Sequence, residues 1–413
     1  MNVEIIVIGD ELLIGQVTDT NSSWIARSLN KIGWEVMEIT TVRDRHVEII
    51  SAIRQSFDRV DVILMTGGLG PTKDDITKQT LCEYFGGKLF FDVEVQKNND
   101  LFFERRGLKM NDSTRTQAMV PDSCTVIQNP VGTAPVMWFE KDGKVLVSMP
   151  GVPAEMQHAM SEEVIPRLRK RFPDNTAILH KTCLVKDFSE SALSEFLSDF
   201  EARLPDSIKL AYLPVPGVIR LRLTGRGEDE SFLFRQLSES FSQLEDRLGK
   251  HIFCHHDATM AEALGLLLIR EGLTIATAES CTGGNIAHEI TSVPGSSAYY
   301  TGSVVSYANE VKVNVLGVDP GIIEKYGVVS GEVVEQMVRG VQRLLKTDCA
   351  VATSGIAGPG GAVPGKPVGT VWIAVAKGDK IISSRYCFGD SRIVNISRFT
   401  HMALLQMITL LCE

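Results

Sequence analysis

The 413-residue sequence has no hydrophobic run long enough to span a membrane, no polybasic segment and no Cys-x-x-Cys pair. Its eight cysteines are scattered, which argues against a zinc ribbon or a disulfide framework and predicts reduced, buried thiols. The net charge of −9, without a long basic stretch, argues against an obligatory nucleic-acid partner and against a membrane anchor. No repeat and no low-complexity tract occurs.

The chain starts directly with a strand-like segment, residues 3–8, and neither a basic leader nor a cleavage site precedes it. We therefore expect a cytoplasmic protein. A length of 413 residues exceeds what one ordinary core holds, so two or three domains are expected.

Apolar strands alternate with helical patterns over residues 1–170. Strands are predicted at 3–8, 36–42 and 60–66, and helices at 22–32 and 47–57. This alternation is typical of a parallel sheet with helices on both faces, closed here by a hairpin around Asp142-Gly143. Ligands of such α/β sheets bind beyond the carboxyl ends of the strands, where this sequence has loops rich in glycine and aspartate.

The loop at residues 66–75 combines a glycine cluster with two aspartates, an arrangement suited to phosphate and to magnesium or manganese. Further acids at strand ends, Asp10, Glu11 and Asp44, are expected to converge there. Taken singly, each acid can also be a helix cap or a solvated side chain. The residues expected to bind a nucleotide are Gly9, Asp10, Gly67, Gly68, Gly70 and Thr72, and those expected to bind the metal are Asp44, Asp74 and Asp75.

A change of pattern separates two further regions. Residues 171–250 read strand, helix, strand, strand, helix, which predicts a small α+β domain serving as a spacer or a dimerising element. His251, His255 and His256 follow it and are expected to lie partly exposed in a linker, because only Asp257 stands near them at ligand spacing. Residues 257–413 form a third α/β domain.

The third domain carries the segment Thr274-Ile-Ala-Thr-Ala-Glu-Ser-Cys-Thr-Gly-Gly284. An apolar strand stops at Ser280, and Gly283-Gly284 precede an amphipathic stretch. Backbone N–H groups in such a turn can bind an oxyanion or a phosphate, as a nucleophilic serine or an anion site requires.

Tyr307 and Lys312 lie downstream and suggest a serine nucleophile activated by a lysine base. Lysine is a base only when neutral, and burial against Val311, Val313 and Val315 would lower its pKa. Spacing alone leaves a second interpretation, in which Ser280 caps the following helix and Lys312 lies on the surface. Cys281 is a rival nucleophile without a histidine in a companion motif.

A second glycine-rich turn, Ser354-Gly-Ile-Ala-Gly-Pro-Gly-Gly361, is expected to contribute Ser354, Gly355 and Gly358 to the same pocket. It lacks the Gly-Lys-Ser/Thr ending of an ATP-binding P-loop, so a nucleoside triphosphate is not implied. A flexible surface loop is the alternative.

Long motifs along the chain resemble those of the CinA family. In the N-terminal region they are Ile8-Gly-Asp-Glu-Leu-Leu-Ile-Gly15 with Asp19-Thr-Asn21, Thr66 to Asp75, Asn129 to Pro135 and Met149 to Met156. In the C-terminal region they are Ala278 to Gly284, Tyr307 to Lys312 and Ser354 to Pro359, which resemble the stand-alone nicotinamide mononucleotide deamidases.

The resemblance implies a bifunctional enzyme of pyridine-nucleotide recycling, with a MogA/MoaB-like molybdopterin-binding fold, a KH-like middle module and a C-terminal deamidase domain. The N-terminal domain would hydrolyse ADP-ribose with a divalent metal (Mg, Mn or Co). The C-terminal domain would convert nicotinamide mononucleotide to nicotinate mononucleotide and ammonia without a cofactor. Ser280 and Lys312 would then form the catalytic pair, Tyr307 would assist, and Gly283, Gly284 and Ser354 would bind substrate.

One departure from the family pattern concerns the substrate phosphate. Where many relatives have Gly-Asp-Arg and a second arginine, this chain reads Gly389-Asp390-Ser391-Arg392 with Asn395. The phosphate-binding arginine is either Arg392 in a shifted register or a residue that has been replaced. Besides the bifunctional enzyme, which we expect to be a homodimer, two alternatives stay open: a deamidase with a regulatory or relic N-terminal domain, and a non-catalytic competence-linked or molybdopterin-binding scaffold.

Overall fold

The computed structural model describes residues 1–72, 75–173, 177–389 and 391–413. Contacts divide this part of the chain into two compact units, Met1–Leu179 with Gly225–Phe234, and His180–Thr224 with Arg235–Glu413. Within the described ranges, no helix combines the length and the apolar character that crossing a membrane requires.

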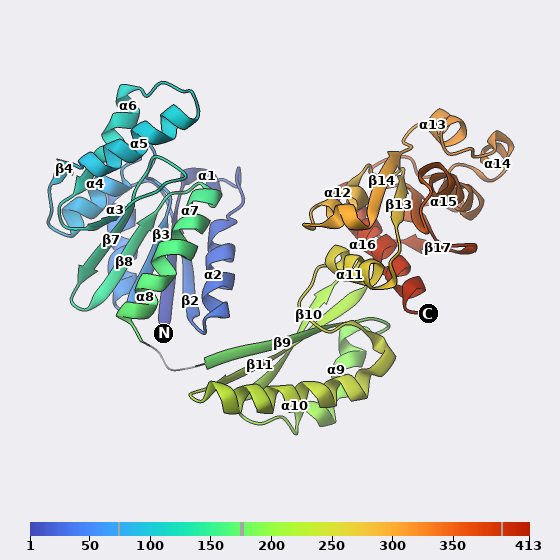
Figure 1. Cartoon of the computed structure of the whole chain (residues 1–413), viewed down its shortest axis with the longest axis horizontal. Coiled ribbons are helices and arrows are strands. Elements are labelled where there is room, and N and C mark those ends of the chain that lie inside the picture. The colour runs from blue at the N-terminus through green and yellow to red at the C-terminus, as the bar shows by residue number, and fades with distance from the viewer. Residues whose placement is uncertain (73–74, 174–176, 390) are drawn as a thin grey trace. The chain divides into compact units, whose positions relative to one another are not determined.

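The first unit is built on a six-stranded sheet with the order β2-β1-β3-β8-β7-β6 (Figure 1). The predicted parallel sheet is confirmed for β2, β1, β3 and β8, whereas β7 pairs antiparallel with both β8 and β6. The direction reverses at the predicted hairpin, where Asp142 and Gly143 both have positive φ, as tight two-residue turns require. The strands are β1 (Asn2–Ile8), β2 (Glu35–Val42), β3 (Val62–Thr66), β6 (Thr125–Ile127), β7 (Val136–Lys141) and β8 (Lys144–Met149).

Helices cover both faces of this sheet because its central strands are buried on both sides. Val62 and Leu64 face the cluster under α2, α7 and α8, while Ile63 and Met65 face the cluster under α3 and α4. The helices are α1 (Asp10–Leu13), α2 (Asn21–Lys31), α3 (His46–Phe57), α4 (Thr77–Tyr84), α7 (Pro153–Ala159) and α8 (Ile165–Arg171), the last two joined by the π-helical turn η2 (Met160–Val164). An excursion adds β4 (Leu89–Phe91), α5 (Val93–Arg105), α6 (Asp112–Arg115), η1 (Thr116–Ala118) and β5 (Met119–Pro121).

The middle region forms a four-stranded sheet with the order β10-β11-β9-β12. Its elements are β9 (Ala177–Val185), α9 (Glu190–Glu201), β10 (Ile208–Val215), β11 (Val218–Gly227), α10 (Glu230–Leu248), η3 (Gly249–His251) and β12 (Ile252–Cys254). The strand–helix–strand–strand–helix–strand sequence is that of a split βαβ unit. Residues 180–254 contain no Gly-x-x-Gly, the loop with which KH domains clamp a nucleic-acid backbone.

The expectation of a linker after residue 250 is wrong for residues 252–254. These three consecutive apolar side chains are buried and form β12, which pairs antiparallel with β9 along an edge that would otherwise be open. The histidines flank this strand: His251 Nδ1 lies 3.3 Å from Asp187 Oδ2, and His255 Nδ1 lies 2.6 Å from Glu245 Oε1.

The C-terminal region forms a five-stranded sheet with the order β14-β13-β15-β16-β17 (Figure 1). β14, β13 and β15 are parallel, and the predicted hairpin of β16 and β17 continues the sheet antiparallel. The strands are β13 (Ile275–Glu279), β14 (Tyr300–Val305), β15 (Cys349–Gly355), β16 (Thr370–Lys377) and β17 (Lys380–Cys387). The helices are α11 (Met260–Glu271), α12 (Asn285–Thr291), η4 (Ser296–Ala298), α13 (Asn309–Asn314), α14 (Pro320–Tyr326), α15 (Gly331–Leu345) and α16 (Arg392–Leu411).

The two faces of this sheet differ in side-chain size. Ile275, Val351, Ile373 and Val375 face α11, α12 and α16, whereas small alanines on β13, β15 and β16 face α15 and let that helix lie close to the strands. These alanines are Ala276, Ala278, Ala350, Ala352, Ala374 and Ala376. The core under α16 also includes Leu184 and Phe253 of the middle sheet, so within the second unit the middle region packs on the C-terminal domain and does not stand apart as a spacer.

Candidate functional site

Three parallel strands of the C-terminal sheet end at one edge and carry the predicted motif residues there. Ser280 follows β13, Tyr307 follows β14, and Ser354 lies at the end of β15. Ser280 N donates to Thr353 O at 3.1 Å, and Ser306 N donates to Glu279 O at 2.8 Å, which ties the three strand ends together. A cavity of about 200 Å³ opens at this edge, lined by Ser280, Cys281, Tyr307, Asn309, Lys312, Val328, Val329, Ser354, Gly355, Ala357 and Arg392.

The amine of Lys312 is the most informative group in the cavity. The side chain is only 1% exposed, and Nζ lies 3.1 Å from Ser280 Oγ, 2.6 Å from Ser306 O and 3.4 Å from Tyr307 O. Desolvation lowers the pKa of Lys312 below its usual value of 10.5, although Cys281 and Glu310 oppose this shift. The alternative of a surface lysine is therefore wrong.

The surroundings of Lys312 differ from the predicted valine wall. Val311 and Val313 are only half-buried, and Val315 is 44% exposed. The amine is instead enclosed by the backbone that follows β14, whose carbonyl groups point at Nζ. A valine pattern could not reveal this, since side-chain spacing does not specify where backbone carbonyls lie.

Ser280 does not cap the helix that follows it. The N-cap of α12 is Gly284, and the carboxylate that satisfies the helix start belongs to Glu279, which accepts hydrogen bonds from the N–H groups of Gly284, Ile286 and Ala287. Gly283 N donates to Ser280 O at 3.2 Å. The amides of Gly283 and Gly284 are thus engaged with protein acceptors, and neither residue lines the cavity, in contrast to their predicted role in binding substrate.

Cys281 lines the same cavity but is a poor nucleophile. Its side chain is 6% exposed, and desolvation raises the pKa of the thiol to about 12. At neutral pH the sulfur therefore stays protonated, and the thiolate that would attack is nearly absent.

Arg392 bridges two loops at the mouth of the cavity. One Nη donates to Gly358 O at 2.7 Å and the other donates to Tyr307 Oη at 3.0 Å. Ser354 Oγ donates to Val328 O at 2.8 Å, and the buried Asn395 donates to Ala357 O at 3.0 Å. An adjoining hollow of about 390 Å³ is lined by Gly355, Gly358, Lys366 and Arg392 among others, so two cations border it.

Sequence reasoning missed Glu279, Asn309 and Lys366. Asn309 stands between Tyr307 and Lys312 in a motif already recognised, so its place in the lining could have been inferred from that spacing. Asp390, which belongs to the departure from the family pattern, lies outside the described residues.

A second cavity, of about 440 Å³, lies at the carboxyl ends of β1 and β3 in the first unit. Of the predicted residues, Asp44, Gly67, Gly68, Gly70 and Asp75 line it, whereas Gly9, Asp10 and Thr72 do not. Asp74 lies outside the described residues. The structure therefore brings the acids and the glycine loop together as the strand-end rule predicts.

The glycine loop needs a glycine at position 67 for steric reasons, and it is held in shape by hydrogen bonds to Asp75. A side chain on Gly67, whose φ is +107°, would place its Cβ 2.1 Å from Ile8 O. Asp75 Oδ1 accepts from Gly70 N at 2.8 Å, and Oδ2 accepts from Thr72 N at 2.9 Å. The loop thus curls around its own aspartate, and these two amides are engaged before any phosphate arrives.

Asp44 carries the strongest electrostatic signal in this cavity. Burial raises the pKa of its carboxyl to about 6, and the neighbouring acids Glu11, Asp10 and Asp75 add to the shift. Its Oδ1 is buried, and no residue in the described part of the chain donates a hydrogen bond to it. Among the described residues, no three His, Cys, Asp or Glu side chains are placed to hold one ion. Mg²⁺ often takes one or two carboxylates and completes its shell with water and substrate phosphate, and Asp44 with Asp75 fit that kind of site.

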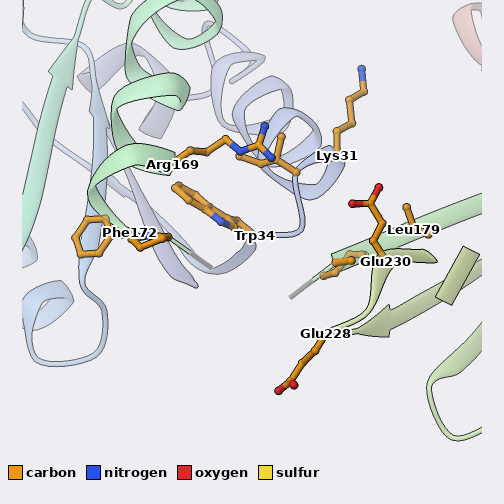
Figure 2. A pocket seen from close by; sticks show the side chains of 11 residues that line it. Lys31, Trp34, Arg169, Phe172, Leu179, Glu228 and Glu230 are labelled. Atoms are coloured by element: carbon orange, nitrogen blue, oxygen red, sulfur yellow. The ribbon is translucent and has the colours of Figure 1, made fainter. Parts of the chain in front are cut away.

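A further hollow of about 1010 Å³ is lined by Lys31, Trp34, Arg169, Phe172, Leu179, Glu228 and Glu230 together with apolar neighbours (Figure 2). Among the described residues that line it, there is no serine, threonine, cysteine or histidine. It offers no nucleophile, and we assign no chemistry to it.

Family models match three consecutive parts of the chain. They describe a probable molybdopterin binding domain at residues 4–170, a damage-inducible protein CinA KH domain at 180–254, and a CinA C-terminal domain at 257–411. A CinA-like protein of Flavobacterium psychrophilum is 46% identical over 409 residues, covering 98% of this chain and 97% of its own. The chain belongs to the CinA family.

Other CinA relatives agree with this assignment. A CinA-like protein of Cytophaga hutchinsonii is 41% identical and covers 98% of this chain and 96% of its own. A solved structure of competence/damage inducible protein CihA from Agrobacterium tumefaciens is 35% identical over 37% of this chain and 96% of that chain, with a TM-score of 0.35. By the three family models and the sheets described above, the chain is a mixed α/β protein with a first domain of the probable molybdopterin-binding type, a middle domain that the CinA KH family describes, and a CinA C-terminal domain.

The Asp44 carboxyl of this CinA protein gives a stability prediction with a defined sign. A carboxyl whose pKa rises on folding from 3.8 to about 6 adds stability below pH 4, and this contribution is lost as the pH rises through 6. Asp44→Asn should therefore raise the free energy of unfolding of metal-free protein at pH 8, by on the order of 1 kcal/mol, and should gain almost nothing at pH 4.

Denaturant unfolding at both pH values checks this prediction. Asp75→Asn is the matched control, and it should be destabilising at pH 8 because Asp75 accepts two backbone N–H groups. A loss of stability at pH 8 in Asp44→Asn would show that the cluster of acids does not strain the folded state.

Proposed function

We propose that the cavity around Ser280 is a Ser/Lys amidohydrolase site that converts nicotinamide mononucleotide to nicotinate mononucleotide and ammonia. The observation that carries the proposal is the buried amine of Lys312, 3.1 Å from the Ser280 hydroxyl. The family resemblance of the motifs around both residues supports the choice of substrate, and membership of the CinA family fits a hydrolase.

The three hydrogen-bond partners of Lys312 Nζ are compatible with the neutral amine that a base requires. Ser306 O and Tyr307 O can only accept, so they take the two protons of a neutral amine. The remaining lone pair then points toward Ser280 Oγ and can accept its proton. Burial lowers the pKa of Lys312, so the neutral amine is more populated than it would be on a lysine in water.

In the proposed reaction, Ser280 Oγ attacks the amide carbon of the nicotinamide group while its proton passes to Lys312. The C–N bond of the tetrahedral intermediate then breaks, and the amide NH2 group takes the proton from Lys312 and leaves as ammonia. The acyl group stays on Ser280 as an ester. Water then attacks the ester and gives a proton to Lys312. Release of the carboxylic acid returns a proton to Ser280 and restores the free enzyme.

The substrate phosphate is proposed to lie in the adjoining hollow, near Arg392 and Lys366. Both side chains now donate to protein oxygens, Arg392 to Gly358 O and Tyr307 Oη, and Lys366 to Tyr326 O at 2.8 Å. Asn395 is buried against Ala357 and is an unsuitable ligand. Of the residues in the departing motif, Arg392 is therefore the proposed phosphate ligand.

A second proposed activity, metal-dependent hydrolysis of ADP-ribose, belongs to the first unit. It is supported by the family resemblance and by the buried Oδ1 of Asp44, to which no described residue donates a hydrogen bond, in a cavity that also contains the glycine loop. Asp44 and Asp75 would hold a divalent ion (Mg, Mn or Co), which when bound would neutralise charge on the pyrophosphate. The chain's own contribution is to place these carboxylates and the glycine loop at one edge of the sheet.

Ser280→Ala should abolish ammonia release from nicotinamide mononucleotide, with a loss on the order of 10³-fold or more, because the nucleophile is gone. Ammonia is measured by a coupled assay. Cys281→Ala is the matched control and should keep most of the rate. If Cys281→Ala were inactive and Ser280→Ala active, the two residues would have been given each other's roles.

Lys312→Arg should be nearly as inactive as Lys312→Ala, because arginine keeps its proton and cannot serve as a base. In the wild type, activity should rise with pH on an acid limb whose midpoint lies below 10.5, since the neutral amine becomes more populated as pH increases. Steady-state rates of the two variants and the pH profile test this. Substantial activity in Lys312→Arg would mean that only the positive charge matters.

Removal of divalent metal should separate the two activities. EDTA is expected to stop ADP-ribose hydrolysis and to leave ammonia release unchanged, because among the described residues carboxylates line the cavity of the first unit but not the cavity around Ser280. Both products are measured in one reaction, and added Mg²⁺ should restore the first. Asp75→Asn should reproduce the selective effect of EDTA. ADP-ribose hydrolysis that persists with EDTA would rule out the proposed role of these aspartates.

A further inference from the structure

Glu279 is a buried carboxylate directly before Ser280 that the proposed reaction leaves without a role. It is 0% exposed. Oε2 accepts from Gly284 N and Ile286 N, both at 3.0 Å, and Oε1 accepts from Ala287 N at 2.8 Å. Thr277 Oγ1 lies 3.4 Å from Oε1. In the part of the chain that the structure describes, no lysine, arginine or histidine forms an ion pair with it.

The hydrogen bonds of Glu279 reach both partners of the Ser/Lys pair. Its side chain closes the turn of residues 280–284 onto the start of α12, so it determines where Ser280 stands. Its backbone carbonyl accepts from Ser306 N at 2.8 Å, and Ser306 O in turn binds Lys312 Nζ at 2.6 Å. One residue therefore connects the turn that carries the nucleophile with the loop that orients the base.

We propose that Glu279 is a positioning residue, which holds Ser280 at 3.1 Å from Lys312 Nζ by fixing the start of α12 and the loop after β14 together. This inference rests on the proposed amidohydrolase function. Three N–H donors converge on one carboxylate here, and a neutral amide cannot accept all of them, because its nitrogen is itself a donor. A displacement well under 1 Å at the nucleophile is enough to slow a reaction strongly.

Glu279→Gln is the direct test. We expect kcat for ammonia release to fall about 10- to 100-fold, KM to change less than about threefold, and the acid limb of the pH profile to stay where it is. The acid limb stays because desolvation is the main cause of the lowered pKa of Lys312, and the charged groups that oppose it are Cys281 and Glu310, not Glu279. An unchanged kcat, or an acid limb that moves, overturns the positioning role.

The matched control is Glu262→Gln, which alters the capping box of α11 in the same domain. It should cost stability without lowering kcat, and an equal fall of kcat in both variants would reduce Glu279 to a general helix cap and overturn the proposal. If Glu279→Gln does not fold, Glu279→Asp replaces it, since a carboxylate shortened by one methylene cannot reach the same N–H groups. Full activity in Glu279→Asp would equally overturn the proposal.

A fluorophosphonate probe separates failure of this inference from failure of the proposed function. Ser280 Oγ displaces fluoride from the phosphorus of the probe and gives its proton to Lys312, so the labelling rate reports the Ser/Lys pair without the natural substrate. The expected result is labelling of Ser280 in the wild type that is at least about tenfold slower in Glu279→Gln. Labelling without ammonia release would refute only the substrate, whereas equal labelling rates would refute the role of Glu279.

Discussion

The functional account depends on the removal of one lysine amine from water. Lys312 lies on a six-residue helix whose neighbouring valines are partly exposed, and yet its side chain is buried because the backbone after β14 wraps around Nζ. Desolvation disfavours the ammonium, and the backbone carbonyls that replace water accept only two of its protons. The third partner of the amine is Ser280 Oγ. The same enclosure therefore removes water from the amine and orients it toward the nucleophile.

A second enclosed lysine in the same chain shows why the identity of the neighbours matters. Lys78 on α4 has its pKa lowered to about 8 by desolvation, but its amine donates to Thr116 O, Gln117 O and Gln117 Oε1. Three oxygens accept from this amine, which suits an ammonium that holds η1 against α4. The third partner of Lys312 is the Ser280 hydroxyl, which can donate as well as accept a hydrogen bond. Burial lowers the pKa of both lysines, and this hydroxyl is what makes Lys312, but not Lys78, suitable as a base.

Hydrophobic periodicity predicted most of the fold, because strands buried on two faces and amphipathic helices leave strong patterns, as at residues 3–8 and 260–271. One pocket for Ser280, Tyr307 and Ser354 was expected from the similarity of their loops, and the parallel directions of β13, β14 and β15 explain why these loops meet. The sequence did not show that β12 extends the middle sheet, since a three-residue strand has no periodicity. It also hid Glu279, because a buried acid that caps a helix from inside a strand looks like any polar residue in a motif. The backbone N–H groups of Gly284 and Gly70, two expected anion donors, are taken by the side chains of Glu279 and Asp75, and the motif spacing did not reveal these bonds.

The central claim is that enclosure lowers the pKa of Lys312, so that its neutral amine is available as the base for Ser280. It is tested most directly by a pH titration of the lysine side chains with ¹³Cε and ¹⁵Nζ NMR, with the Lys312 signal assigned from its absence in Lys312→Met. The account predicts a midpoint for Lys312 clearly below 10.5 that moves when Ser280 is replaced by alanine, because the serine is the third partner of the amine. A midpoint at the ordinary lysine value, insensitive to Ser280, would contradict the account.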